Sequence, residues 1–475
     1  MINSKNLINI SLIFVIILGV FLRLYNLNYD DLWFDEMATF WVTDPNISFS
    51  EMFERHKSTE LAPQFYYIII YFLNVIFGYE PEIGRYFSSI IGILSIFSVG
   101  YLVKIVNNSN AYKLSMYLMS LNVYLISYSM EMRAYMLVFF LSSLSLISIF
   151  KYINTKNKLF LFTFSITQTL AAFTHPFTII IFVSIFSFQI FIYFVKKNTS
   201  DKNLNFSLAL TTIFIFIITF LYYFNLNITD DYTWNKQPNI KFYTNFYFSK
   251  FFGSRLLGLI HLLTLIYFIF KFKKSIFKLN DKLLILFIIL CLSYIIPIVY
   301  GVYKPILNSK YIIFVIIPII TLLCVLVYDL KNKIIKNTII AIFLIVTIGN
   351  QFTEQNFKQF YDERKYFKPQ FNSALNYINS SDNKNYTVNV EFTNEKIKKK
   401  YEDIYLNYFQ HLSKKNNYNI NFISSNEYNN MNSTQIWILC SHLVFNENCK
   451  KIKNNQTIME NKNFSNIYMN LVKKN

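Results

Sequence analysis

Glycine is scarce in this sequence, with nine glycines among 475 residues. Neither a Gly-x-x-x-x-Gly-Lys-Ser/Thr segment nor a Gly-x-Gly-x-x-Gly segment occurs. Such glycine-rich turns let backbone N–H groups approach and hold the phosphates of a nucleotide. We therefore expect no nucleotide site of either type, and a bound phosphate would have to be held by Arg and Lys side chains.

Charged residues are also scarce, at 15% of the chain, whereas a soluble domain carries roughly a quarter. Hydrophobic residues make up 54% and gather in long runs such as 7–22 and 284–300. A helix needs about 18–20 apolar residues to cross a hydrocarbon core of roughly 30 Å. The composition predicts a polytopic α-helical protein of the cell membrane. No small-residue cleavage site follows the first run at Arg23, so we expect this run to remain as a transmembrane helix.

Acidic residues are fewer than basic ones, 27 against 45, which gives a net charge of +18. A nucleic-acid partner is nevertheless not expected, because the lysines cluster in short loops between apolar runs and in the tail. Lys and Arg in such loops normally fix the orientation of the chain in the membrane. The loops predicted on this ground to be cytoplasmic are 196–202, 271–282 and 331–336.

The number of apolar runs conflicts with this orientation. About twelve runs occur between residues 7 and 349. With a cytoplasmic N-terminus, loop 26–63 is extracytoplasmic, and the basic loops place the tail on the same side. Twelve full crossings would instead return the tail to the cytoplasm. One run between residues 64 and 150 is therefore expected to be re-entrant or broken.

The polar tail differs in composition from the rest of the chain. We expect a transmembrane domain over 1–350 and a soluble extracytoplasmic α/β domain over 351–475. The segment 371–379 has the apolar spacing of an amphipathic helix, while 386–392 and 433–439 are typical of strands.

The four cysteines fall into two groups. Cys291 and Cys324 lie inside apolar runs and are expected to be packing residues. Cys440 and Cys449 lie in the tail, where an extracytoplasmic location would let a disulfide persist. The separation between them allows the chain to turn back and bring their Cα atoms within bonding range. The alternative is two free thiols in a cytoplasmic tail.

An acidic pair, Asp35 and Glu36, follows the first apolar run in the segment 29–41. The pair could belong to an ordinary solvated loop. Its neighbours, however, are side chains that favour a membrane interface. A carboxylate held among them is partly desolvated, which raises its basicity. The flanking side chains are Trp33, Phe34, Met37, Phe40 and Trp41.

Other ionisable residues interrupt the apolar runs. Glu131 and Arg133 lie within an apolar stretch, where ionisable groups are costly and face a partner or a cavity. A structural ion pair is the alternative. Arg85 stands at a predicted helix start, and His175 at a break in a run, where a structural role is more common than a catalytic one. Lys310 is expected on the outer face, with interfacial snorkelling as the alternative.

No group of His, Cys and acidic residues has the spacing of metal ligands. We therefore expect no cofactor; the sequence requires no metal and leaves a dependence on metal open. The cations near the membrane boundaries, with no nucleotide motif, favour a lipid-borne phosphate over a nucleotide as the group to be bound.

Five segments, in order, resemble the GT-C membrane glycosyltransferases of the protein O-mannosyltransferase and aminoarabinose-transferase type (glycosyltransferase family 39-type). They extend over roughly residues 1–330, and the first is similar to the Leu-Trp-x-Asp-Glu-Ala opening of that family. The segments are LRLYNLNYDDLWFDEMAT (22–39), ELAPQFYY (60–67), GYEPEIGRYFSSIIG (78–92), MEMRAYML (130–137) and PILNSKYIIFVIIP (305–318).

The resemblance implies a GT-C fold with about 11–13 transmembrane helices and places Asp35 at the position of the family's catalytic acid, with Glu36 beside it. Two departures occur. Ala62 stands where the family has the first of two prolines. Lys310 replaces a late arginine, which keeps the charge but loses the bidentate fork.

The predicted activity is transfer of a sugar from a polyprenyl-phosphate-linked donor to a glycan, lipid or protein acceptor on the extracytoplasmic face. Asp35 would act as general base, and Arg133 and Lys310 would neutralise the leaving phosphate. The alternatives are a transporter or lipid flippase, and a polymerase or ligase of surface polysaccharide. The residues expected at the donor are Arg85, Glu131, Arg133, Lys310 and Tyr311, and those at the acceptor or cavity are Glu60, Tyr66 and His175.

Overall fold

The protein was analysed as a computed structural model. It describes residues 4–60, 62–107, 109–194, 201–223, 249–272, 280–303, 308–353, 368–389, 395–424, 427–428, 435–441 and 456–474.

The chain forms two compact units. The helical unit consists of Met1–Tyr25, Phe53–Ile70 and Ile83–Glu363. The mixed unit consists of Asn26–Met52, Tyr71–Glu82 and Arg364–Asn475. Most of the predicted acidic loop thus folds in the same unit as the C-terminal tail. The predicted domain boundary at residue 351 stays a prediction.

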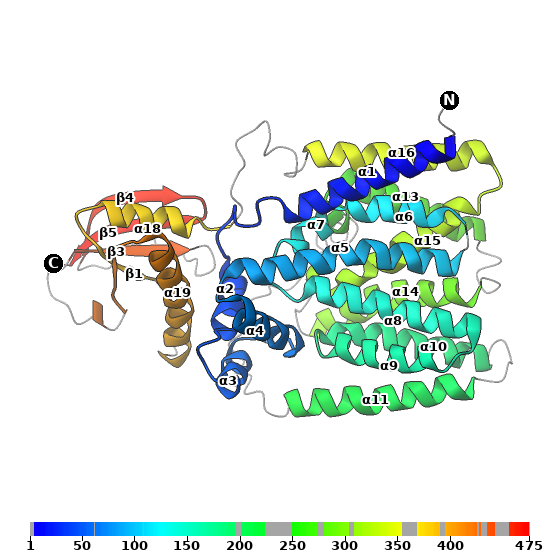
Figure 1. The fold of residues 1–475 in the computed structure, drawn as a ribbon, viewed down its shortest axis with the longest axis horizontal. Coiled ribbons are helices and arrows are strands. Elements are labelled where there is room, and N and C mark those ends of the chain that lie inside the picture. Colours follow the sequence, from blue (N-terminus) through cyan, green and yellow to red (C-terminus); the bar gives the residue numbers. More distant parts are fainter. Residues whose placement is uncertain are drawn as a thin grey trace. The chain divides into compact units, whose positions relative to one another are not determined.

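The helical unit is a layered bundle of long apolar helices (Figure 1). Among the described residues, six helices are long and apolar enough to cross a membrane, and five shorter apolar helices accompany them. The predicted polytopic helical architecture is confirmed. The elements are α1 Ser4–Leu24, α5 Pro81–Val106, α6 Ala111–Ser120, α7 Val123–Ser129, α8 Tyr135–Thr155, α9 Leu159–Ala172, η1 Pro176–Thr178, α10 Ile179–Phe194, α11 Lys202–Tyr223, α13 Arg255–Phe272, α14 Asp281–Tyr303, η3 Ser309–Val315, α15 Ile316–Tyr328 and α16 Lys333–Thr353.

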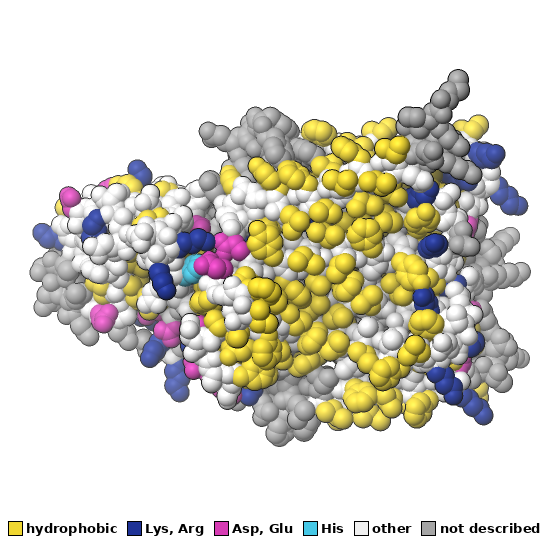
Figure 2. Space-filling model, viewed as in Figure 1, with side chains coloured by type: hydrophobic (Ala, Val, Ile, Leu, Met, Phe, Trp, Pro, Cys, Tyr) yellow, Lys and Arg dark blue, Asp and Glu magenta, His cyan; other side chains and the backbone are white. Residues whose placement is uncertain are grey.

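The surface of this unit has the chemistry of a membrane-embedded bundle. Apolar side chains cover the sides of the helices, and Lys and Arg gather at one end of them (Figure 2). Large side chains such as Phe14, Phe162 and Phe216 are exposed on the outside, while Phe139 and Phe314 are buried between helices. The exposed apolar belt is suited to lipid and not to water. The chain is a multi-pass membrane protein.

Contacts near the helix ends resolve the topology between residues 24 and 81. The Ser89 hydroxyl, early in α5, donates to the carbonyl of Arg23 at the end of α1 and to that of Ser129 at the end of α7. At the opposite end of α1, Asn9 accepts a hydrogen bond from Lys113, which lies in the first turn of α6. Helices α1 and α5 therefore run in opposite directions, and the chain between them makes no net crossing.

The apolar run 64–77 is therefore no crossing. It forms the short helix α4, Phe65–Phe77, which with α3, Phe49–Thr59, lies in the segment that begins and ends at one end of the bundle. At 13 residues it is also too short to cross a membrane. The expected re-entrant or broken run is found here, and the tail again follows a helix that ends opposite the basic loops.

The run 114–130 is also broken, between α6 and α7. The buried Arg23 guanidinium donates to the carbonyls of Met119 and Ser120 at 2.9 and 2.8 Å. The Asn122 side chain caps α7 by accepting from the N–H of Leu125 at 2.9 Å. These bonds satisfy carbonyls and N–H groups that the break would otherwise leave unpaired in an apolar interior.

The mixed unit contains a five-stranded sheet of order β2-β1-β3-β5-β4. Strand β1 is parallel to β2 and β3, and β5 is antiparallel to β3 and β4. The predicted helix and both predicted strands are found as α18, β1 and β3, whereas α19 and the β4–β5 pair were not predicted. The elements are α2 Phe34–Val42, α18 Phe371–Ser380, β1 Asn385–Val388, α19 Glu395–Asn416, β2 Asn421–Phe422, β3 Gln435–Ser441, β4 Gln456–Phe464 and β5 Ile467–Lys474.

The core of this unit explains why these elements form. Helix α19 presents Tyr405 and Phe409 to Phe371 of α18, with ring centroids 5.8 and 5.1 Å apart. Trp437 of β3 is fully buried against α18, and its indole N–H donates to Ser381. Cys440, at the end of β3, is disulfide-bonded. Its predicted partner Cys449 lies outside the described residues.

Candidate functional site

The acidic pair lies in the first turn of α2. The helix starts after Trp33, whose extended backbone offers its carbonyl to the N–H groups of Glu36 and Met37. A carboxylate near a helix N-terminus is stabilised by the helix dipole. Helix geometry points consecutive side chains in different directions. Asp35 is consequently half-buried, whereas Glu36 has an exposed fraction of 0%.

Glu36 is paired with a residue far away in the sequence. Its Oε2 lies 2.6 Å from Nζ of Lys368, which precedes α18. The Lys368 side chain is itself 16% exposed. A charge-assisted hydrogen bond of this length compensates much of the cost of burying the carboxylate. The two adjacent acids therefore differ: one is accessible and the other is neutralised.

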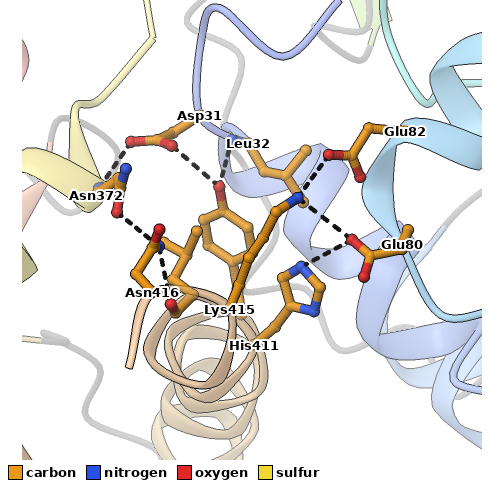
Figure 3. A network of polar contacts seen from close by, with 10 residues as sticks. Asp31, Leu32, Glu80, Glu82, Asn372, His411, Lys415 and Asn416 are labelled. Atoms are coloured by element: carbon orange, nitrogen blue, oxygen red, sulfur yellow. Dashed lines mark hydrogen bonds and ion pairs between the residues drawn. The ribbon is translucent and has the colours of Figure 1, made fainter. Parts of the chain in front are cut away.

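The residues before α2 are held by the tail of the chain (Figure 3). Asp31 accepts from the backbone N–H of Asn372 at 2.8 Å. The Tyr408 hydroxyl of α19 accepts from the N–H of Leu32 at 3.2 Å and donates to Asp31 at 3.3 Å. The ring of Phe34 stacks on a tyrosine of α19 at 4.6 Å. The position of Asp35 thus depends on the C-terminal segment.

A second contact region in Figure 3 involves the end of α19. Lys415 Nζ lies 2.8 Å from Glu82 and 3.4 Å from Glu80, and His411 Nε2 lies 3.4 Å from Glu80. Burial lowers the pKa of His411 below its usual value, and the negative charge of Glu80 opposes this only in part. These pairs are more exposed than the contact of Glu36, and none of them includes a predicted site residue.

A polar cluster in the helical unit surrounds Arg133. The Arg133 guanidinium donates to both oxygens of Glu60, Nη1 to Oε1 at 2.5 Å and Nη2 to Oε2 at 3.2 Å. It also donates to the hydroxyl of Tyr67 at 3.3 Å. The side chains of Arg133 and Glu60 are 9% and 11% exposed. Sequence left open a structural ion pair of Glu131, with Arg133 or with another helix, whereas the carboxylate that Arg133 meets in the structure is that of Glu60.

His56 packs behind this cluster. Its ring meets that of Tyr67 edge to face, with the centroids 4.4 Å apart. Burial, together with the charge of Arg133, lowers the pKa of His56 to about 3, although a backbone hydrogen bond with Ala62 acts in the opposite direction. His56 is therefore neutral at physiological pH and adds no charge beside Arg133.

Tyr135 brings the two predicted phosphate-binding cations to one place. Nζ of Lys310 lies 5.4 Å from the centroid of the Tyr135 ring, and the Arg133 guanidinium carbon lies 5.9 Å from it. His175 and Tyr311 are adjacent, with ring centroids 5.1 Å apart. The Asn308 side chain caps the start of η3 by accepting from the N–H of Lys310, which fixes the backbone at Lys310.

Three further predicted residues lie in the same unit. Tyr66 is buried, and its hydroxyl is 3.3 Å from that of Ser88, which in turn lies 3.5 Å from the carbonyl of Arg133. Arg85 is buried, and Glu131 is half-buried in the turn before α8. The structure therefore gathers the predicted donor and cavity residues in the helical unit and places Asp35 and Glu36 in the mixed unit.

Sequence reasoning missed Lys368, Tyr67 and His56. Tyr67 and His56 stand close to Glu60 in the chain, and their nearness to an acidic residue at a membrane boundary was an available signal. Lys368 is one of many lysines in a polar tail and is 332 positions from Glu36, so nothing local distinguishes it. Within the described ranges, no group of three or more His, Cys, Asp or Glu residues could hold a metal ion.

Comparisons with known proteins show what this fold resembles. No protein-family model and no curated protein sequence matches the chain. Among solved structures, ArnT from Cupriavidus metallidurans bound to undecaprenyl phosphate superimposes with a TM-score of 0.59 at 9% identity, covering 96% of this chain and 97% of that one. The apo form of the same protein gives 0.58 at 10% identity and 98% of both chains.

The archaeal oligosaccharyltransferase AglB from Archaeoglobus fulgidus, in complex with an inhibitory peptide and a dolichol-phosphate, gives a TM-score of 0.56 at 11% identity. The match covers 92% of this chain and 70% of that one. ArnT and AglB are both GT-C glycosyltransferases. At such low identity the likeness concerns the fold alone, and the chain has the GT-C fold with a small C-terminal sheet region.

Proposed function

We propose that this protein is an integral membrane glycosyltransferase that uses a polyprenyl-phosphate-linked sugar as donor. In the reaction, an acceptor hydroxyl oxygen bonds to the anomeric carbon while the bond from that carbon to the phosphate oxygen breaks. Asp35 takes the proton of the hydroxyl, and the polyprenyl phosphate leaves with the bonding electrons. The acceptor is a glycan, lipid or protein, and the reaction as proposed uses no metal.

The observation that carries this proposal is the likeness over nearly the whole chain to ArnT, solved with undecaprenyl phosphate. AglB, on the same fold, was solved with a dolichol-phosphate. Both proteins were solved with a polyprenyl phosphate. The sequence of this chain offers Lys and Arg side chains, and no glycine-rich motif, for a phosphate. A lipid-linked donor agrees with both observations.

Roles for individual side chains follow from their surroundings. Asp35 is the accessible member of its pair, and a general base must reach the proton that it abstracts. Lys310 is proposed to stabilise the charge that develops on the leaving phosphate. Arg133 is proposed to assist it, although its guanidinium is already bidentate with Glu60, so a phosphate would have to share it.

The proposed orientation rests on the basic rim. The helix ends with basic loops lie together: Lys282 of α14 donates to the carbonyl of Ile105 at the end of α5, and Asn107 bonds Asp329 after α15. Placing this rim in the cytoplasm follows the distribution of Lys and Arg in membrane proteins. The reaction and the C-terminal segment are then extracytoplasmic.

The test is turnover of Asp35→Asn in purified protein supplied with a polyprenyl-phosphate-linked sugar. The amide keeps the shape and removes the base, so turnover should fall by about 10²–10⁴-fold. Asp44→Asn is the matched control, because Asp44 follows α2 directly and accepts from the backbone and side chain of Asn46 in a local turn. A parent-like rate for Asp35→Asn would remove Asp35 from the mechanism. Movement of lipid-linked sugar across vesicles without transfer would favour a transporter.

A further inference from the structure

We infer that Lys368 is a positioning residue of the proposed glycosyl transfer: it neutralises the buried Glu36 so that its neighbour Asp35 can act as base. The inference rests on the proposed function. It assigns to the C-terminal segment a part in the chemistry, since Lys368 reaches the acidic pair from the other end of the chain.

The ion pair between Lys368 and Glu36 is largely buried. Glu36 has no exposed surface, and Lys368 is 16% exposed, with 2.6 Å between Nζ and Oε2. A carboxylate without its cation at such a site is strongly unfavourable. Most lysine ion pairs on a protein surface contribute little, and Lys57 with Glu54 is of that kind, at 27% and 70% exposed.

Lys368 is held in place by the residues that follow it. Pro369 is buried, and a proline restricts the residue before it to extended backbone conformations. Gln370 is bonded twice to Ser465, its N–H donating at 3.1 Å and its Oε1 accepting at 2.9 Å. The backbone on which Lys368 stands is thus fixed before its side chain reaches Glu36.

The two chain segments meet at both of their ends. Lys368 bonds Glu36 at one end. At the other end, the N–H of Asn372 donates to Asp31 (Figure 3). Tyr408 adds two hydrogen bonds at the Asp31 end. The segment 31–36 therefore has its shape set by the tail, and Asp35 lies inside the fixed portion.

The consequence for Asp35 is a change of its position. With Lys368 present, residue 36 contributes a neutral pair. Without it, the buried carboxylate of Glu36 has lost its cation, and the cost of that burial is relieved when the first turn of α2, which carries Asp35, shifts toward water. Turnover should therefore depend on the charge of residue 368, while donor binding by the helical unit should not.

The experiment compares Lys368→Met, Lys368→Arg and the double variant Lys368→Met with Glu36→Gln, in the full-length protein. We expect Lys368→Met to lower kcat about 10- to 100-fold, with the donor KM within about three-fold, because a misplacement of about 1 Å at a reacting group costs up to about 100-fold in rate. Lys368→Arg should stay within about three-fold of the parent. The double variant, which carries no unpaired charge, should recover at least about ten-fold over Lys368→Met.

The matched control is Lys415→Met, because Lys415 also pairs with acids within the mixed unit, and those acids are Glu80 and Glu82 instead of the pair in α2. Its kcat should equal that of the parent. If Lys368→Met kept parental kcat while Asp35→Asn was inactive, the inference would be overturned and the proposed function would stand. If Asp35→Asn itself kept parental activity, the proposed function would fall.

Folding is followed for each variant by thermal unfolding and gel filtration. Should Lys368→Met fail to fold, the other two variants decide. A folded and active double variant, together with an active Lys368→Arg, supports the charge-neutralising role. A folded double variant as inactive as Asp35→Asn overturns it.

Discussion

The bidentate pair between Arg133 and Glu60 predicts a large thermodynamic coupling inside the helical unit. Both side chains are nearly buried, at 9% and 11% exposed, and two N–H groups of one guanidinium meet two oxygens of one carboxylate. Removing one partner of a buried pair strands the other charge, which costs about 3–5 kcal/mol. Glu60→Gln and Arg133→Met should therefore each lower the free energy of unfolding by about that amount.

The double variant tests the reason for this cost. Because neither charge is stranded in it, its loss should be smaller than the sum of the single losses, with an interaction free energy of about 1–3 kcal/mol. The assay is the free energy of unfolding of purified protein in bicelles, measured by steric trapping. The control is Lys57→Met, whose exposed partner Glu54 predicts a change below about 1 kcal/mol. Additive losses from Glu60→Gln and Arg133→Met would refute the reasoning.

Three further predictions follow from single side chains. The pKa of His56 is lowered to about 3 by burial, so below pH 6.5 the unfolded state binds a proton that the folded state does not. Between pH 7.5 and 5.5 the parent should lose about 1.4 kcal/mol of stability that His56→Gln keeps, and parallel pH curves would contradict this. Lys310→Met should raise the donor KM about ten-fold, since a hydrogen bond to a charged group contributes about 1.5–3 kcal/mol, whereas Lys336→Met at the basic rim should leave it unchanged. A membrane-impermeant thiol reagent on intact cells should label the chain only after reduction, but should label Cys440→Ser directly; labelling only after lysis would place the tail in the cytoplasm.

Much of the fold could be predicted because local composition and apolar spacing determine it. The apolar runs gave the bundle helices, and the amphipathic spacing of 371–379 gave α18. The break at His175 is where α9 ends and η1 begins. The sequence could not identify which apolar run fails to cross the membrane, because a hydropathy pattern shows how apolar a run is and not whether it crosses. The shortness of α4, at 13 residues, suggested that this run does not cross the membrane. The contact between Ser89 and Arg23 is what shows that the chain between α1 and α5 makes no net crossing.

The site could be predicted in part. Sequence placed Asp35, Arg133 and Lys310 near membrane boundaries, and the roles given to them stay predictions. It could not separate Asp35 from Glu36, because the difference arises from helix geometry and from a lysine 332 positions away. The partner of Arg133 was equally hidden, since Glu60 is 73 positions from it and belongs to a different segment. Long-range ion pairs leave no periodic signal in a single sequence.

The central claim, sugar transfer from a polyprenyl-phosphate carrier, is tested most directly by mass spectrometry of lipids bound to the purified protein. The measurement records the masses of co-purifying lipids before and after incubation with a membrane extract that supplies acceptors. We expect a polyprenyl-phosphate-linked sugar that is converted to free polyprenyl phosphate by the parent and persists in Asp35→Asn. Recovery of no such lipid, or its equal conversion by parent and Asp35→Asn, would contradict the account.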